Sequence, residues 1–167
     1  MSHTPGTSRI PALGPRGEGW VIGQIALLGA CVLLGARHIG RLDLASPAVW
    51  ILLLVGPLTM LLGALVLAAG VRDLGLSLTP WPRPHEGASL VETGIYGRLR
   101  NPIYAGMILL AIGWAAFTAS PTALLAALLL VLWLDLKARR EEAWLSARYP
   151  SYDAYRSRTS RFVPGIY

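Results

Sequence analysis

The chain has 167 residues, a length typical of one domain, and 54% of them are hydrophobic whereas only 14% are charged. A soluble domain usually carries about 25% charged residues, so this composition favours lipid as the solvent. The net charge of +6 does not indicate nucleic-acid binding, because the basic residues lie between apolar runs and no nucleic-acid-binding motif is present.

Residues 1–18 are rich in proline and glycine and predict a disordered or loosely attached arm. Two uncharged runs follow, Trp20–Ala36 and Pro47–Val71, and each is long enough to cross a bilayer. Residues 19–71 are therefore predicted to form the first two transmembrane helices. The single cysteine, Cys31, excludes an intrachain disulfide and is expected to be a small packing residue. Gln24 and Thr59, inside the spans, are expected to form interhelical hydrogen bonds.

Residues 72–101 are polar and contain three closely spaced prolines, which predicts a surface loop. Residues 102–134 carry no charge and are too long for one ordinary span. Ser120-Pro121 interrupts them near the middle. We therefore predict a helical hairpin with arms at Ile103–Ala119 and Thr122–Leu134.

Residues 135–149 are charged and consist mostly of good helix formers, with Lys137 and Glu141 one turn apart. Pro150 ends this segment, and a short helix through Tyr152 and Tyr155 is expected after it. The predicted fold class is an all-α integral membrane bundle of about four spans, with C-terminal helices over residues 135–167.

The basic residues are distributed unequally between the two predicted membrane faces. The arm, the 72–101 loop and the tail carry thirteen Lys and Arg, whereas the opposite side has only Arg37 and Arg41. The positive-inside rule then places both termini and the polar segments in the cytoplasm, in a protein of the inner membrane.

Two blocks in the C-terminal half resemble a known superfamily. Residues 94–106, GIYGRLRNPIYAG, resemble the G-x-Y-x-x-x-R-[HN]-P-x-Y block of the isoprenylcysteine carboxyl methyltransferase and phospholipid methyltransferase superfamily. Residues 141–145, EEAWL, with the spaced tyrosines and the Phe162-Val163-Pro164 that follow, resemble its second block. The stretch 78–82, LTPWP, is also similar to bacterial members. The resemblance covers residues 72–167.

This resemblance implies that the hairpin and the tail helix enclose S-adenosylmethionine and that a lipophilic acceptor enters from the bilayer. The cofactor-binding positions that it implies are Gly94, Tyr96, Arg100, Asn101, Pro102, Tyr104, Glu141, Glu142 and Tyr152. The catalytic positions are Lys137, Arg100 and Glu142. Membrane lipids and the acceptor are the expected partners, and neither an obligate protein partner nor a metal is indicated.

The implied roles follow from the chemistry of the cofactor. Glu141 or Glu142 suits its amine or ribose hydroxyls, Arg100 suits its carboxylate, and the tyrosines suit its adenine or sulfonium. Lys137 is implied to lie near an acceptor carboxylate. Asn101 stands where many members have His, so it cannot titrate.

Each of these positions also has an ordinary structural interpretation. The two glutamates fit a solvated helix face, and the tyrosines fit an aromatic belt at the membrane surface. Arg100 fits an orientation charge, and Lys137 fits a lysine that extends towards the membrane surface.

The sequence does not choose between O-methylation of a carboxylate and N-methylation of an amine. Two further alternatives stay open at this point. One is a reductase-like membrane relative that uses a nicotinamide cofactor, and the other is a non-catalytic membrane module that binds a ligand.

Overall fold

The computed structural model describes residues 10–79 and 89–166. Most of the predicted N-terminal arm, the proline-rich part of the 72–101 loop and the prolines of the 78–82 stretch lie outside, or at the edge of, the described residues. These two ranges hold the helices, turns and contacts of the described structure.

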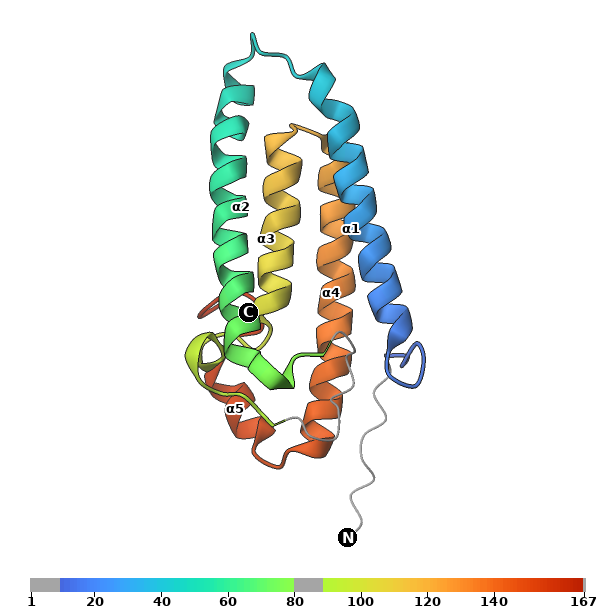
Figure 1. Ribbon diagram of the computed structural model, residues 1–167, viewed down its shortest axis with the longest axis vertical. Helices are drawn as coiled ribbons and strands as arrows, with labels where there is room; N and C mark the ends of the chain where they lie inside the picture. The colour runs from blue at the N-terminus through green and yellow to red at the C-terminus, as the bar shows by residue number, and fades with distance from the viewer. Residues whose placement is uncertain (1–9, 80–88, 167) are drawn as a thin grey trace.

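Four long helices run alternately up and down, and a short fifth helix lies at one end of them (Figure 1). They are α1 (Glu18–His38), α2 (Pro47–Leu74), α3 (Pro102–Phe117), α4 (Pro121–Arg148) and α5 (Tyr152–Arg158). Short 3-10 turns cover Ile39–Arg41, Gly75–Ser77 and Gly94–Gly97. The described residues form no β-sheet, and an isolated bridge joins Leu99 to Ser160. The predicted all-α fold is confirmed.

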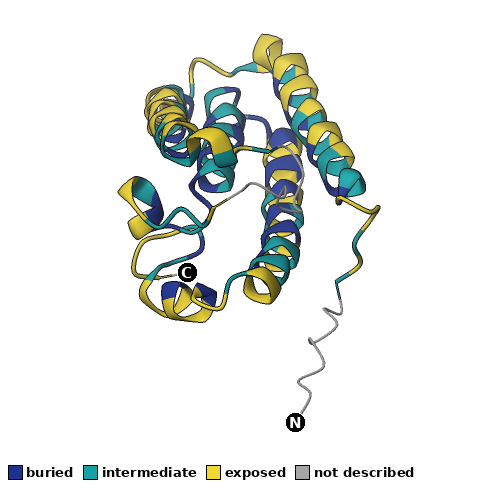
Figure 2. Cartoon of the chain, turned by 60° about the horizontal axis from the view of Figure 1, so that its bottom comes forward, coloured by how far each residue is buried: buried dark blue, intermediate teal, exposed yellow. Residues whose placement is uncertain are grey.

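Three of these helices are long and apolar enough to cross a membrane: α1 with its following turn, α2 with its following turn, and α4. The fourth, α3, is apolar but has only 16 residues. Buried residues face the interior of the bundle, whereas much of its outside is exposed (Figure 2). On α2 the exposed outer surface is apolar, with Leu54 65% and Leu65 61% exposed, as expected for contact with lipid. The chain is therefore an integral membrane helical bundle.

The predicted hairpin is present in the last two long helices. The chain reverses at Ala119, where φ is +46°, and the Ser120 hydroxyl caps α4 by accepting from the Ala123 amide at 3.1 Å. Pro121 occupies the first turn of α4, where its missing amide hydrogen leaves no hydrogen bond unmade. The apolar second arm and the charged segment form one continuous helix that ends at Arg148. As a result, α3 begins and α4 ends at the same end of the bundle.

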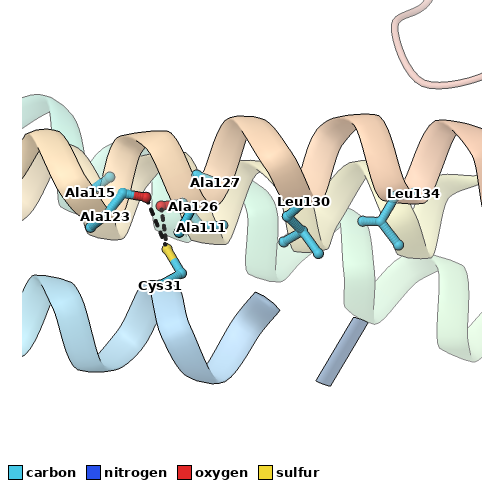
Figure 3. Close-up of a cluster of buried hydrophobic side chains, with 8 residues drawn as sticks. All are labelled: Cys31, Ala111, Ala115, Ala123, Ala126, Ala127, Leu130 and Leu134. Carbon is cyan, nitrogen blue, oxygen red and sulfur yellow. Dashed lines mark hydrogen bonds between the residues drawn. The ribbon is translucent and has the colours of Figure 1, made fainter. Parts of the chain in front are cut away.

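Cys31 and five alanines, together with two leucines of α4, fill the contact between α1, α3 and α4 (Figure 3). Cys31 is 1% exposed, and its thiol contacts the carbonyl oxygens of Ala111 at 3.7 Å and Ala123 at 3.6 Å. The expectation that Cys31 packs as a small residue is confirmed. Alanines at the remaining contacts allow the helices to approach closely, as is common in membranes.

The contact between α2 and α3 depends on glycines spaced seven residues apart, Gly56 and Gly63 on α2 opposite Gly113 and Gly106 on α3. A Cβ at Gly63 would lie 2.9 Å from the Gly106 carbonyl oxygen, and one at Gly113 would lie 2.8 Å from the Gly56 carbonyl oxygen. These distances leave no room for a side chain. Close packing fixes the end of α2 beside the segment that precedes α3.

The two polar residues inside the spans, Gln24 and Thr59, were both predicted to form interhelical hydrogen bonds, and the structure confirms one of the two predictions. Gln24 bonds to residues of α3 and α4, so its predicted interhelical role is confirmed. For Thr59 the prediction is wrong, because its hydroxyl donates to the Val55 carbonyl of its own helix at 2.8 Å. A carbonyl one turn earlier is always within reach of a helical threonine, so no partner helix is needed.

Candidate functional site

A cavity of about 420 Å³ lies at the end of the bundle where the loops and α5 gather. All five helices and the segments around residues 77–79 and 89–101 contribute to its lining. Seven of the ten predicted site residues are among the lining residues: Tyr96, Arg100, Asn101, Tyr104, Lys137, Glu141 and Tyr152. The other three, Gly94, Pro102 and Glu142, lie beside the cavity and do not line it.

The part of the cavity that extends between the long helices is mainly apolar. Val21 of α1, Leu67 and Val71 of α2, and Met107 of α3 contribute to it. Helix α2 packs mainly on α3, and α1 packs mainly on α4. Helices α1 and α2 therefore do not pack extensively on each other. The cavity therefore combines a polar layer of loops and tail with an apolar region between helices.

Gly94 and Pro102 determine the path of the segment that carries Tyr96 and Arg100. Gly94 has φ +61°, and a Cβ there would collide with the carboxylate of Asp73 in the last turn of α2. That carboxylate accepts from the Ile95 amide at 2.8 Å. Pro102 begins α3 directly after this segment. Both residues place the neighbouring site residues without lining the cavity themselves.

Glu142 is the centre of a buried charge cluster. One carboxylate oxygen accepts from Arg100 Nε at 3.1 Å, Asn101 Nδ2 at 3.3 Å and Arg161 Nε at 3.1 Å, and the other accepts from Arg161 Nη2 at 3.1 Å. Arg161 Nη1 also donates to Asp135, about two turns before Glu142 on α4, at 2.8 Å. A carboxylate has about four acceptor positions, so Glu142 is saturated by protein donors.

Residues 159–161 lie along the segment 98–101 and are called the strap below. Ser160 donates to the Arg98 carbonyl at 3.0 Å, and its own carbonyl accepts from the Arg100 amide at 2.8 Å. The Asn101 amide donates to the Arg161 carbonyl at 3.2 Å. Arg100 Nη1 donates to the Arg156 carbonyl at 3.0 Å and to the Thr159 carbonyl. The strap and Glu142 therefore hold Arg100 from two directions.

A second polar cluster, around Lys137, has a different character. The Lys137 side chain is buried, and its ammonium donates to Gln24 Oε1 at 2.5 Å and lies 4.9 Å from the centre of the Tyr104 ring. Glu141, one turn further, instead accepts from the Tyr104 hydroxyl at 2.8 Å. Within the described ranges no carboxylate lies at ion-pair distance from Lys137. This cluster therefore retains unused hydrogen-bonding capacity at the cavity wall.

Three tyrosines from the loop and α5 complete the lining. Burial raises the pKa of Tyr96 and of Tyr152 well above the usual tyrosine range, and it raises the pKa of Tyr155 to about 12. All three phenols are therefore protonated at neutral pH. Tyr155 donates to the Tyr96 carbonyl at 2.8 Å, whereas the hydroxyls of Tyr96 and Tyr152 bond to no residue that the structure describes.

Sequence reasoning did not identify four residues that build this site: Gln24, Asp73, Tyr155 and Arg161. Gln24 was recognisable as a polar residue in an apolar span, but its partner was not. Tyr155 was noted only as one of several spaced tyrosines. Asp73 and Arg161 resemble ordinary charges at a helix end and in a tail, and no local pattern distinguishes them.

Comparison with known proteins gives a family and a relative. The sequence profile of the phospholipid methyltransferase family matches residues 51–151, more than half of the chain. The nickel-cobalt-cadmium resistance protein NccN of Alcaligenes xylosoxydans xylosoxydans is 35% identical over 82 residues, which are 48% of this chain. The match spans only 38% of that protein's length. Among the residues that the structure describes, no group of three His, Cys, Asp or Glu is placed to hold a metal.

Proposed function

The chain belongs to the phospholipid methyltransferase family, and on this basis we propose that it is a membrane-embedded S-adenosylmethionine-dependent methyltransferase with a lipophilic acceptor. The observation that carries the proposal is the cavity, which joins a polar layer of loop and tail residues to an apolar region between α1 and α2. Its volume of about 420 Å³ lies within the range of about 300–1,000 Å³ typical of small-molecule sites.

The polar groups of the cavity match the functional groups of the cofactor. Glu141 offers a carboxylate for the amine or the ribose hydroxyls, and Arg100 offers a guanidinium for the carboxylate. The hydroxyls of Tyr96 and Tyr152 are without described protein partners and offer donors to ribose or adenine. Because four protein hydrogen bonds already occupy the Glu142 carboxylate, the proposal gives direct contact with the cofactor to Glu141 and an indirect role to Glu142.

Bound S-adenosylmethionine supplies a methyl group on a sulfonium, which an acceptor takes by in-line displacement. The protein then mainly positions the reactants and excludes water. Tyr104 is held by Glu141 and lies beside Lys137, so its ring forms an ordered wall between the two charges. No residue is required to act as a nucleophile.

Lys137 favours an acceptor that carries an anionic oxygen. Its ammonium has three donors and a single described acceptor, the neutral amide oxygen of Gln24. A buried cation that forms no direct ion pair within the described residues attracts an anionic group and repels a protonated amine. The apolar lining from α1 and α2 suits the lipophilic part of such an acceptor.

The cofactor assignment is tested by calorimetry of the purified full chain in detergent with S-adenosylhomocysteine. We expect saturable binding of one molecule, and Glu141→Gln should weaken it because the amide keeps an acceptor but loses the negative charge that pairs with the cofactor amine. NADPH is the matched probe for the reductase alternative. Binding of NADPH without binding of S-adenosylhomocysteine would refute the proposal, and binding of neither would favour the non-catalytic module.

We further propose that the cavity faces the cytoplasm from the inner membrane. The start of α1, the end of α2, the segment before α3 and the tail lie at one end of the bundle (Figure 1), and eleven of the thirteen basic residues that the structure describes belong to these segments. C-terminal fusions to reporters that are active on only one side of the membrane test this. Activity of a cytoplasmic reporter is expected, and activity of a periplasmic one would reverse the orientation.

A further inference from the structure

The strap contains a buried cation, Arg161, that does not line the cavity and has no role in the proposed chemistry. Its residue is 7% exposed, and both of its contacts with Glu142 are buried. It lies outside the residues 51–151 that match the family profile. A buried guanidinium in a C-terminal tail is costly unless it is well paired, so its pairing calls for an explanation.

We propose that Arg161 is a positioning residue, which acts through Glu142 to hold Arg100 and Asn101 in the orientation in which they line the cavity. The inference rests on the proposed function, because it concerns the residues assigned to the cofactor. Arg161 itself touches neither the cofactor nor the acceptor.

Arg161 fixes the orientation of the Glu142 carboxylate. Arg161 donates to both carboxylate oxygens, at 3.1 Å each, through Nε and Nη2. This paired contact fixes the plane of the carboxylate, as a fork-shaped guanidinium does. The oxygen that accepts from Arg161 Nε also accepts from Arg100 and Asn101. Turning this carboxylate would therefore displace both cavity residues.

The Arg100 guanidinium has few hydrogen-bond acceptors other than Glu142. Among the described residues, its guanidinium donates to Glu142, to tail carbonyls and to the Thr159 hydroxyl. All of these acceptors other than Glu142 belong to the tail. Without Arg161, Glu142 would lose half of its donors, and the strap would lose its main attachment to α4.

Backbone hydrogen bonds also join the strap to Arg100 and Asn101. The carbonyls of Ser160 and Arg161 accept from the amides of Arg100 and Asn101. Each cavity residue is thus tied to the strap by its backbone and to Glu142 by its side chain. Arg161 belongs to both connections, because its carbonyl lies in the first and its guanidinium in the second. Its contact with Asp135 adds a further attachment to α4 at 2.8 Å.

The decisive experiment measures S-adenosylhomocysteine affinity of Arg161→Met by calorimetry on the full chain in detergent. We expect a loss of at least about tenfold, because the oriented hydrogen bonds of Arg100 are no longer held. Arg156→Met is the matched control, since it removes an arginine of the same tail whose side chain is exposed. The control should bind within about twofold of wild type. Unchanged affinity of Arg161→Met would overturn the proposal.

Loss of stability alone must be separated from loss of positioning. Gly113→Ala destabilises the α2–α3 contact away from the cavity, because its Cβ would lie 2.8 Å from the Gly56 carbonyl oxygen. This variant should retain its affinity despite a lower melting temperature. An equal affinity loss in both variants would assign Arg161 a merely structural role and overturn the proposal.

A double-mutant cycle tests whether Arg161 acts through Glu142. In a Glu142→Gln background, Arg161→Met should cost much less affinity than it does in the wild-type chain. Equal costs in both backgrounds would show that Arg161 acts independently of Glu142, and would overturn the proposed route.

Amide hydrogen exchange supplies a measurement that needs no cofactor. Arg161→Met should lose protection at the Arg100 and Asn101 amides, whereas Arg156→Met should keep it. If the wild-type chain binds no S-adenosylhomocysteine, the proposed function fails. Amide exchange then tests by itself whether Arg161 holds Arg100 and Asn101 in place. Full protection in Arg161→Met would overturn the inference whatever the ligand.

Discussion

Two polar clusters on neighbouring turns of α4 differ in how completely their charges are paired. Around Glu142, two guanidiniums and an amide saturate one carboxylate. Around Lys137, a buried ammonium has a single amide oxygen as its described acceptor. The Glu142 carboxylate is occupied by four protein hydrogen bonds, whereas the Lys137 ammonium keeps donors that a ligand can use. Complete pairing therefore indicates a scaffold, and incomplete pairing at a cavity wall indicates a ligand site.

The largest expected effect is on the stability of the saturated cluster. Glu142→Ala leaves the Arg100 guanidinium without a carboxylate and Arg161 with Asp135 alone, and we expect it to cost about 3–5 kcal/mol. Unfolding in detergent, followed by circular dichroism, measures this loss. From the sequence alone, the same variant is expected to fold normally and lose only cofactor binding. If Glu142→Ala unfolds in the same way as wild type, the expectation from the sequence alone holds and the predicted loss of stability is wrong.

The unsaturated cluster should behave in the opposite way. Lys137→Met removes a buried unpaired cation while keeping a similar volume, so stability should change by less than about 2 kcal/mol. Methyl transfer to an acceptor with a carboxylate should fall about 100-fold, because the group that holds it is lost. Radiolabel transfer from S-adenosylmethionine to lauric acid measures this, with lauryl amine as the matched acceptor. A large stability loss with full activity would remove the contrast between the clusters.

A smaller effect is expected at Tyr104, which joins Lys137 and Glu141. Tyr104→Phe keeps the ring beside Lys137 but removes the hydrogen bond to Glu141 at 2.8 Å. We expect S-adenosylhomocysteine affinity to fall about 3- to 10-fold, because Glu141 is no longer oriented. Calorimetry beside Tyr149→Phe, a lining tyrosine outside the cluster, measures this difference. Equal effects of the two variants would argue against a special role for Tyr104.

The smallest effect concerns the tail at high pH. Burial raises the pKa of Tyr155 to about 12, above an unfolded value of about 10. Its contribution to stability is therefore fully present below about pH 10 and is lost as the pH rises towards 12. Melting temperatures of wild type and Tyr155→Phe should converge over this interval. A constant difference between them would contradict the shifted pKa.

Much of the fold was accessible from the sequence because membrane spans are local features. Uncharged runs of sufficient length predict helices, since backbone groups in lipid must be bonded within the segment. The hairpin was predicted for an equally local reason, because residues 102–134 are too long for one span and Ser120-Pro121 interrupts them. The structure adds that Ser120 caps α4 and that Pro121 lies in its first turn. The α2–α3 contact was also visible in principle, as glycines seven residues apart, but their partners were not.

The candidate site could be predicted from the sequence only in part. Resemblance to the superfamily supplied ten positions, nine from the two motif blocks and Lys137 from its spacing before Glu142, and seven of the ten line the cavity. Sequence order cannot tell which of two adjacent glutamates faces a cavity, because both sit on the same helix and differ only by its rotation. The packing of α3 and of the strap against α4 decided that Glu141 lines the cavity and Glu142 lies beside it.

The sequence by itself determined that the chain lies in lipid, where its long helices and the hairpin are, and which residue types are available for chemistry. Tertiary structure alone decided which charges are paired. Gln24 and Lys137 are separated by 113 residues, and Arg100 and Thr159 by 59, so only folding brings them together. Electrostatic interactions depend on distance and burial, not on order along the chain. For that reason the distinction between scaffold and candidate site appeared only with the packed helices.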